Sequence, residues 1–193
     1  MTQLSKIREK LDIIGEKYLD TSVLEKLLAK FAPSYSISQI CDTGMISPIK
    51  RGKFYINNVN RDIENPYKIA DMYFEGVGYM FGGLGVYNVY GYSTQLVEWH
   101  TVYNTKISGE RIIGRTKFIF KKQRNGFFYG ETEQKSGRYI YKIMSRERAF
   151  IQMLQEGKVW KKLPENIDVK KLLSLAEAYS TKNIYNSIKK ICS

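Results

Sequence analysis

The sequence predicts an α+β fold, with an N-terminal winged helix-turn-helix followed by a mixed α/β domain that has a mainly antiparallel sheet and C-terminal helices. Three observations predict it. Up to residue 57, three segments of helical periodicity precede two short strand-like segments. From residue 99 to residue 145 the apolar residues alternate as in strands. Beyond residue 145 the helical period returns, so we expect a helical C-terminal third.

The first two helices are predicted by apolar residues that recur every three or four positions. The first pattern consists of Leu4, Ile7, Leu11 and Ile14 and ends at Gly15. The second runs from Val23 to Phe31 and stops before Pro33. Ser22 and Glu25 have the spacing of a capping box at its start.

A third helix within residues 34–43 has one apolar face and one polar face. Ile37, Ile40 and Cys41 share the apolar face, and about 100° of rotation per residue places Tyr35, Gln39, Asp42 and Thr43 opposite. Gly44 is suited to the left-handed conformation that ends a helix. We therefore expect a DNA-recognition helix, with Tyr35, Ser36, Gln39 and Thr43 facing the major groove.

A basic hairpin is predicted directly after this helix. Met45 to Lys50 and Lys53 to Ile56 form its strands, and Arg51-Gly52 forms the turn. Lys50, Arg51 and Lys53 are expected to hold DNA phosphates, as the wing of such a domain does. Basic hairpin turns also occur for solubility alone, but helix, glycine, strand and basic turn follow in the order typical of DNA binding. Asp42 opposes DNA unless it accepts a hydrogen bond from a cytosine amine.

A polar, turn-prone segment at residues 57–62 predicts a domain boundary, with a winged helix over 1–58 and a second domain over 59–193. Asn65-Pro66 then has the pattern of an N-cap followed by a helix. The glycine-rich segment at 76–91 does not match the dinucleotide-binding pattern and is interpreted as close helix packing.

Five strands are expected in the second domain, followed by three helices. The strands are predicted at 101–104, 110–114, 116–120, 127–129 and 138–143, separated by glycine or polar turns. Ser145 and Asp168 are predicted to cap helices over 146–155 and 169–179, and a last helix covers 181–191.

The charge of the chain favours polyanionic partners. The net charge is +12, and residues 101–148 hold twelve Lys and Arg against four Asp and Glu. A field of that sign attracts nucleic acid or an acidic protein. No apolar run approaches the roughly 20 residues of a membrane span, and Cys41 and Cys192 lie far apart. We expect a cytoplasmic protein without metal or cofactor.

Catalysis has little support in the sequence. Glu110 with Glu133 and Lys135 has the residue types of a metal-dependent nuclease, although the Glu-x-Lys falls in a polar segment expected between strands. His100 is the single histidine and is expected to be structural. A nuclease therefore remains an alternative, as does a basic adaptor that binds RNA or protein.

The order of motifs resembles the AbiEi family of bacterial antitoxin-regulators, the antitoxin half of type IV toxin–antitoxin pairs. The resemblance spans nearly the whole chain. It rests on the basic Arg-Gly wing at 50–56, the Asn-Pro helix at 65–70, the helix ending in Tyr-Gly at 84–91, and Glu147-Arg148-Ala149. Arg146 and Gln152 stand where the family usually has Pro and Asp.

This resemblance implies a cytoplasmic autorepressor that binds inverted repeats at its own operator in double-stranded DNA. Its C-terminal domain would counteract a toxin of nucleotidyltransferase type, without a stable complex being required. An inverted repeat needs two chains, either as a dimer or as monomers that bind cooperatively. The basic sheet at 101–148 is the surface we expect to act in neutralisation.

Overall fold

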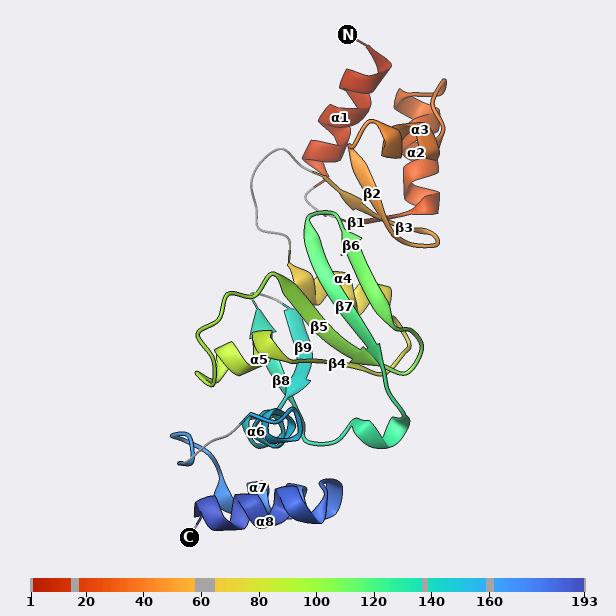
Figure 1. Cartoon of the computed structure of the whole chain (residues 1–193). Coiled ribbons are helices and arrows are strands. Elements are labelled where there is room, and N and C mark those ends of the chain that lie inside the picture. The colour runs from red at the N-terminus through yellow and green to blue at the C-terminus, as the bar shows by residue number, and fades with distance from the viewer. Residues whose placement is uncertain (1, 15–17, 58–64, 137–138, 159–161, 193) are drawn as a thin grey trace. The chain divides into compact units, whose positions relative to one another are not determined.

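The computed structural model describes residues 2–14, 18–57, 65–136, 139–158 and 162–192 (Figure 1). Its contacts divide the chain into two units. The first holds residues 1–75 with 112–116, and the second holds 76–111 with 117–193. Both units combine helices with strands, which confirms the α+β class. The boundary expected at 58/59 lies outside the described residues, and the helix at 66–73 groups with the first unit.

The first unit consists of four helices and a three-stranded sheet. The helices are α1 (Gln3–Ile13), α2 (Thr21–Phe31), α3 (Ile37–Asp42) and α4 (Pro66–Tyr73). The strands are β1 (Tyr18–Asp20), β2 (Ile46–Lys50) and β3 (Lys53–Ile56), arranged β1-β3-β2. Both strand pairs are antiparallel.

The core of the first unit is formed by the apolar faces that the helical spacing predicts. Residues of α1, α2 and α3 meet residues of β1, β2 and β3 in one buried cluster: Ile7, Leu11, Leu19, Leu24, Leu28, Ala32, Ile40, Met45, Ile46 and Ile56. Burial of these side chains is the main favourable contribution to this packing.

Two details at the start of α2 differ from the sequence prediction. The N-cap is Asp20 rather than Ser22, and no side chain caps the helix there. Asp20 also ends β1, a strand that the sequence analysis did not predict. A strand of three residues is too short for an alternating pattern to be recognised, and its pairing with β3 is what defines it.

A six-stranded sheet of order β6-β7-β5-β4-β9-β8 belongs to the second unit, except for residues 112–116 of its β6–β7 hairpin. The strands are β4 (Tyr79–Gly82), β5 (Trp99–Asn104), β6 (Gly109–Ile113), β7 (Thr116–Lys122), β8 (Glu131–Ser136) and β9 (Tyr139–Met144). β4 pairs with β5 and β8 with β9 in antiparallel fashion, whereas β4 with β9 and β5 with β7 are parallel. The sheet is therefore mixed.

Three segments of this sheet differ from the sequence prediction. The glycine-rich segment contributes β4 as well as a helix, because Gly82 lets the strand approach Tyr103 and Met144. The segment at 127–129 is not a strand, since η1 (Asn125–Phe127) is a 3-10 turn there. Residues 131–136 form β8, an edge strand whose exposed, polar composition resembles that of a loop.

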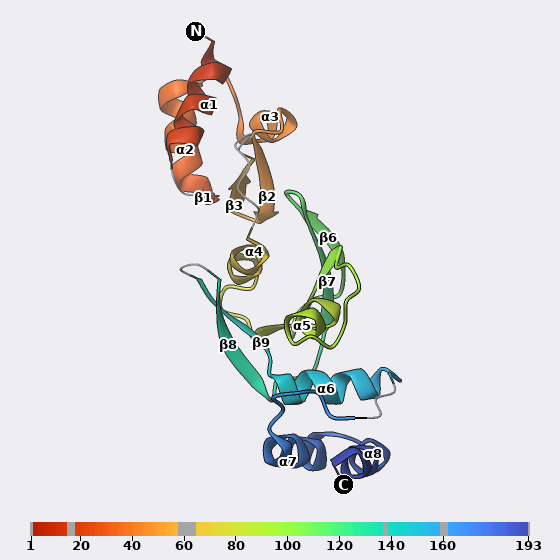
Figure 2. The same ribbon diagram turned by 90° about the vertical axis from the view of Figure 1, so that its left-hand side faces the viewer.

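The helices of the second unit follow the predicted positions closely. They are α5 (Leu84–Val89), α6 (Arg146–Gln155), α7 (Val169–Tyr179) and α8 (Lys182–Cys192). Ser145 and Asp168 cap α6 and α7 as expected. Figures 1 and 2 show α6 between the sheet and the α7–α8 pair. In the described part of the chain, every helix is too short or too polar to cross a membrane.

We expect Gly82→Ala to destabilise the second unit by about 1–3 kcal/mol, the usual cost of overpacking a core. A Cβ atom at this position would lie 2.6 Å from Tyr103 Cε2 and 2.8 Å from Met144 Cε. The Met144 terminus can move, but the Tyr103 ring is only 2% exposed. Urea unfolding followed by circular dichroism measures the loss. The matched control is Gly78→Ala, whose added Cβ meets nothing within 4 Å, and an equal loss in both variants contradicts this explanation.

Candidate nucleic-acid interface

Helix α3 begins with a reciprocal pair of hydrogen bonds between Ser36 and Gln39. The Gln39 backbone N–H donates to Ser36 Oγ at 3.3 Å, and Gln39 Oε1 accepts from the Ser36 backbone N–H at 2.8 Å. Ser36 Oγ also donates to Gln39 Oε1 at 3.1 Å. This capping box fixes the start of a helix of only six residues.

The capping interactions change the expected roles of three predicted base-reading residues. Gln39 is exposed, but a bidentate contact with adenine needs both its oxygen and its nitrogen, and Oε1 is engaged at the cap. Thr43 is exposed too, and its hydroxyl donates to the Ile40 carbonyl at 2.7 Å. Ser36, Gln39 and Thr43 thus stabilise α3 in the free chain. The Ser-x-x-Gln spacing is the sequence signature of such a capping box, but the sequence analysis assigned these residues to base contacts instead.

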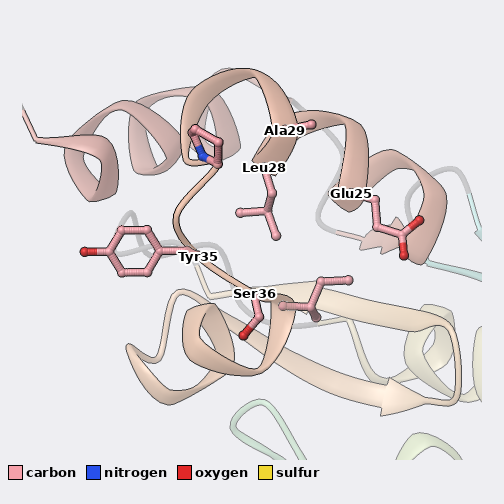
Figure 3. A pocket seen from close by; sticks show the side chains of 7 residues that line it. Glu25, Leu28, Ala29, Tyr35 and Ser36 are labelled. Carbon is pink, nitrogen blue, oxygen red and sulfur yellow. The ribbon is translucent and has the colours of Figure 1, made fainter.

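Tyr35 is half-buried and packs against the core cluster rather than lying fully on the polar face. Its ring borders a groove of about 530 Å³ between α2 and the start of α3. Figure 3 shows Leu28 directed from α2 into this space, while the Tyr35 hydroxyl points away from it. The full lining is Glu25, Leu28, Ala29, Pro33, Tyr35, Ser36 and Ile37. The Tyr35 hydroxyl is therefore directed away from the groove that its half-buried ring borders.

Ser38 and Asp42 are the exposed α3 side chains that the sequence analysis left out of the predicted site. They lie four residues apart, so they share one face of the helix, with Gln39 beside them. The same helical spacing that selected Gln39 would have selected Ser38. Asp42 was not among the predicted site residues because its negative charge opposes DNA, although a carboxylate can accept a hydrogen bond from a cytosine amine.

The cations of the β2–β3 hairpin have unequal surroundings. Arg51 lies in the turn and is exposed. Lys50 Nζ lies 3.4 Å and Lys53 Nζ 2.8 Å from the same oxygen, Oε2 of Glu75. No acidic residue lies between Thr43 and Asn60 in the sequence, because Glu75 comes from beyond α4. In the free chain, Lys50 and Lys53 therefore have an acidic partner that the local sequence does not contain.

The residues of the nuclease alternative are not brought together. Glu110 lies on β6, and Glu133 and Lys135 lie on β8, at opposite edges of the sheet. Within the described residues no group of three or more His, Cys, Asp or Glu has the arrangement of a metal site. The His100 ring lies 5.9 Å from the Phe118 ring, and burial lowers its pKa, which favours the neutral imidazole.

The second unit contains a buried guanidinium on α6. Arg148 is 1% exposed, and its Cζ lies 4.3 Å from the Tyr129 ring centroid and 4.8 Å from that of Phe127. Tyr129 in turn stacks on Tyr179 of α7, with centroids 3.9 Å apart. The aromatic faces stabilise the charge by cation–π attraction. Two of these rings come from residues 127–129, the segment that the sequence predicted as a strand.

The neighbour of Arg148 forms an ion pair with α7. Lys171 Nζ lies 3.0 Å from Oε2 of the buried Glu147. Burial is the largest single influence and raises the pKa of Glu147, but the hydrogen bonds from Lys171, from Ser145 and from the backbone, together with the charge of Lys171, lower the pKa overall. Glu147 and Arg148 thus join α6 to α7 and to the segment before β8, which is a structural role.

The fold is similar to a crystal structure of the RV2827C protein from Mycobacterium tuberculosis. The TM-score is 0.67 at 11% sequence identity, and the match covers 99% of this chain and 76% of that chain. At this identity the likeness concerns the fold alone. No family model matches the chain, and no curated protein matches it.

We expect Ser36→Ala to destabilise α3 by about 1 kcal/mol, the typical cost of losing an N-cap side chain. Hydrogen exchange of the Gln39 amide, which donates to Ser36 Oγ, reports the loss directly. Ser38→Ala is the matched control, because Ser38 is exposed and lies outside the cap. Equal exchange rates in both variants would show that the capping box contributes nothing.

Proposed function

We propose that this chain is a DNA-binding autorepressor and that residues 2–57 form a winged helix-turn-helix. The observation that carries the proposal is the exposed, capped face of α3 next to a hairpin with three cations. The order helix, strand, helix, helix, strand, strand supports it, as it is the order that such domains require. The net charge of +12 favours association with a polyanion.

In the proposed complex α3 enters the major groove of double-stranded DNA. Ser38, Asp42 and the Tyr35 hydroxyl offer polar atoms to base edges, because the side-chain oxygens of Ser36, Gln39 and Thr43 serve the helix ends. Gln39 contributes its amide nitrogen. The hairpin cations bind the adjacent phosphates and set the register of the helix on the duplex.

The operator proposed is an inverted repeat upstream of the chain's own gene. Two α3 helices must then occupy successive major grooves, about one helical turn apart. Either a dimer or cooperative binding of two monomers satisfies this geometry.

The antitoxin half of the proposal rests on the resemblance in motif order. We propose that the second unit counteracts a nucleotidyltransferase-type toxin in the cytoplasm without a stable complex. Glu147 and Arg148 of the shared Glu-Arg-Ala motif are buried, so they support the unit and are not offered as contact residues. Co-expression with the neighbouring gene product tests this half of the proposal. The full chain is expected to restore the growth that this product inhibits.

Fluorescence anisotropy with the upstream duplex tests DNA binding. The wild-type chain is expected to bind it more tightly than a random duplex of equal length, and a variant with Lys50, Arg51 and Lys53 changed to Ala is expected to lose binding to both. Unchanged affinity in that variant removes the hairpin from the mechanism. Preference for structured RNA over the duplex favours the adaptor function instead.

Arg51→Ala alone is expected to weaken binding to every duplex by about 3- to 10-fold and to reduce the slope of log K against log salt by about 1. The reason is that a phosphate contact carries no sequence information. Lys190→Ala removes the same charge from an exposed position of α8 in the second unit and serves as control. A change in sequence preference with Arg51→Ala would contradict a phosphate contact.

Asp42→Asn is expected to strengthen binding to random DNA and to reduce the ratio of operator to random affinity by about 5-fold or more. The carboxylate repels phosphates, whereas a contact with a cytosine amine contributes about 1–3 kcal/mol of base discrimination. Titrations of both duplexes measure the ratio. If both affinities rise equally, Asp42 repels DNA without reading a base.

A further inference from the structure

One carboxylate occupies the space between the two hairpin lysines. Glu75, which follows α4, places a single oxygen 2.8 Å from Lys53 Nζ and 3.4 Å from Lys50 Nζ. Asp20 of β1 lies farther from Lys53, at 3.8 Å. Glu75 is therefore the closest anion to both lysines, and Asp20 is a second, more distant partner of Lys53.

The hairpin geometry brings the two lysines together. Lys50 ends β2 and Lys53 begins β3, and the two residues are direct partners in the antiparallel register. Partners of this kind project from the same face of the pair. The turn between them is held by a hydrogen bond from the Thr21 backbone N–H to the Gly52 carbonyl at 2.9 Å. The backbone thus places both lysine side chains on one face of the hairpin.

The ion pair that Glu75 forms with the two lysines is accessible to solvent. The hydrogen bond from Lys53 lowers the pKa of Glu75, and the same bond raises the pKa of Lys53. The Glu75 side chain is nevertheless 61% exposed, against 21% for Lys53 and 27% for Lys50. Exposed ion pairs contribute little to stability, so another anion can replace this carboxylate at little cost.

We propose that Lys50 and Lys53 form a phosphate-binding site that Glu75 fills in the free protein and that a backbone phosphate of DNA takes over in the complex. A phosphate oxygen accepts the same charge-assisted hydrogen bonds from ammonium groups as a carboxylate oxygen does. This inference rests on the proposed function. Glu75 thereby competes with the DNA phosphate for the two lysines, so it sets the affinity of the chain for DNA and the salt dependence of that affinity. The exposed Arg51 is available to phosphate already in the free protein.

Glu75→Gln in the full chain tests the proposal. The amide keeps the size of the side chain but leaves the lysine pair without its anion, so both cations are open to phosphate. The expected result is about 3- to 10-fold tighter binding to any duplex near 0.1 M salt. The slope of log K against log salt should steepen by about 1, because binding by the wild type frees the Glu75 carboxylate, which takes up a salt cation, and Glu75→Gln removes this uptake.

Two controls separate displacement of Glu75 from a general change in charge. Glu9→Gln removes the same charge from α1, where Glu9 lies 3.4 Å from Lys10, and should change DNA affinity by less than about 2-fold. Adding Lys50→Ala and Lys53→Ala to Glu75→Gln should abolish the gain. An equal gain in Glu9→Gln, or a gain that survives loss of both lysines, overturns the proposal.

The outcome also distinguishes this inference from the proposed function. If the wild-type chain binds DNA and Glu75→Gln changes neither affinity nor slope, the inference fails and the function stands. If no variant binds DNA, the function fails, and titration with inorganic tripolyphosphate followed by NMR decides the site. Tighter tripolyphosphate binding by Glu75→Gln than by wild type and Glu9→Gln supports the phosphate site, and equal binding overturns it.

Discussion

The buried contact of Ile40 determines what the N-terminal unit can present to a ligand. Helix α3 has six residues, too few to be stable in water by itself. Its orientation therefore depends on the fully buried Ile40 within the core of α1, α2 and the sheet, and on the capping box at Ser36. Once Ile40 faces inward, helical geometry leaves Ser38, Gln39 and Asp42 exposed. The burial of Ile40 thus decides which side chains of α3 face solvent.

The net charge around the β2–β3 hairpin depends on residues that are distant from it in the sequence. A local count gives three cations and no acidic residue, whereas the folded unit supplies Glu75 and, farther away, Asp20. Binding of a polyanion by such a surface is an exchange of one anion for another, in which a carboxylate leaves as a phosphate arrives. The free energy released is then smaller than the number of lysines suggests.

Local signals were predictable from the sequence, and pairing between distant segments was not. The bounds of α7 were predicted because Asp168 caps an apolar period that ends at Tyr179. The strand β8 was missed because its exposed edge position allows a polar composition. At the site, helical spacing identified the exposed face of α3. The cap role of Gln39 could have been predicted from the Ser-x-x-Gln spacing, whereas the position of Glu75 required three-dimensional contacts.

The parallel pairing in the mixed sheet has a consequence for synthesis on the ribosome. β4 lies between β5, which follows soon in the chain, and β9, which emerges only after β6, β7 and β8. Until β9 has been synthesised, one edge of β4 has no partner strand. β4 contains the apolar residues Met80 and Phe81, which are both buried in the finished sheet. Such an edge is a template for pairing with other chains. Nascent or truncated chains that end before Tyr139 are thus exposed to aggregation, whereas the sheet of the first unit is complete at Ile56.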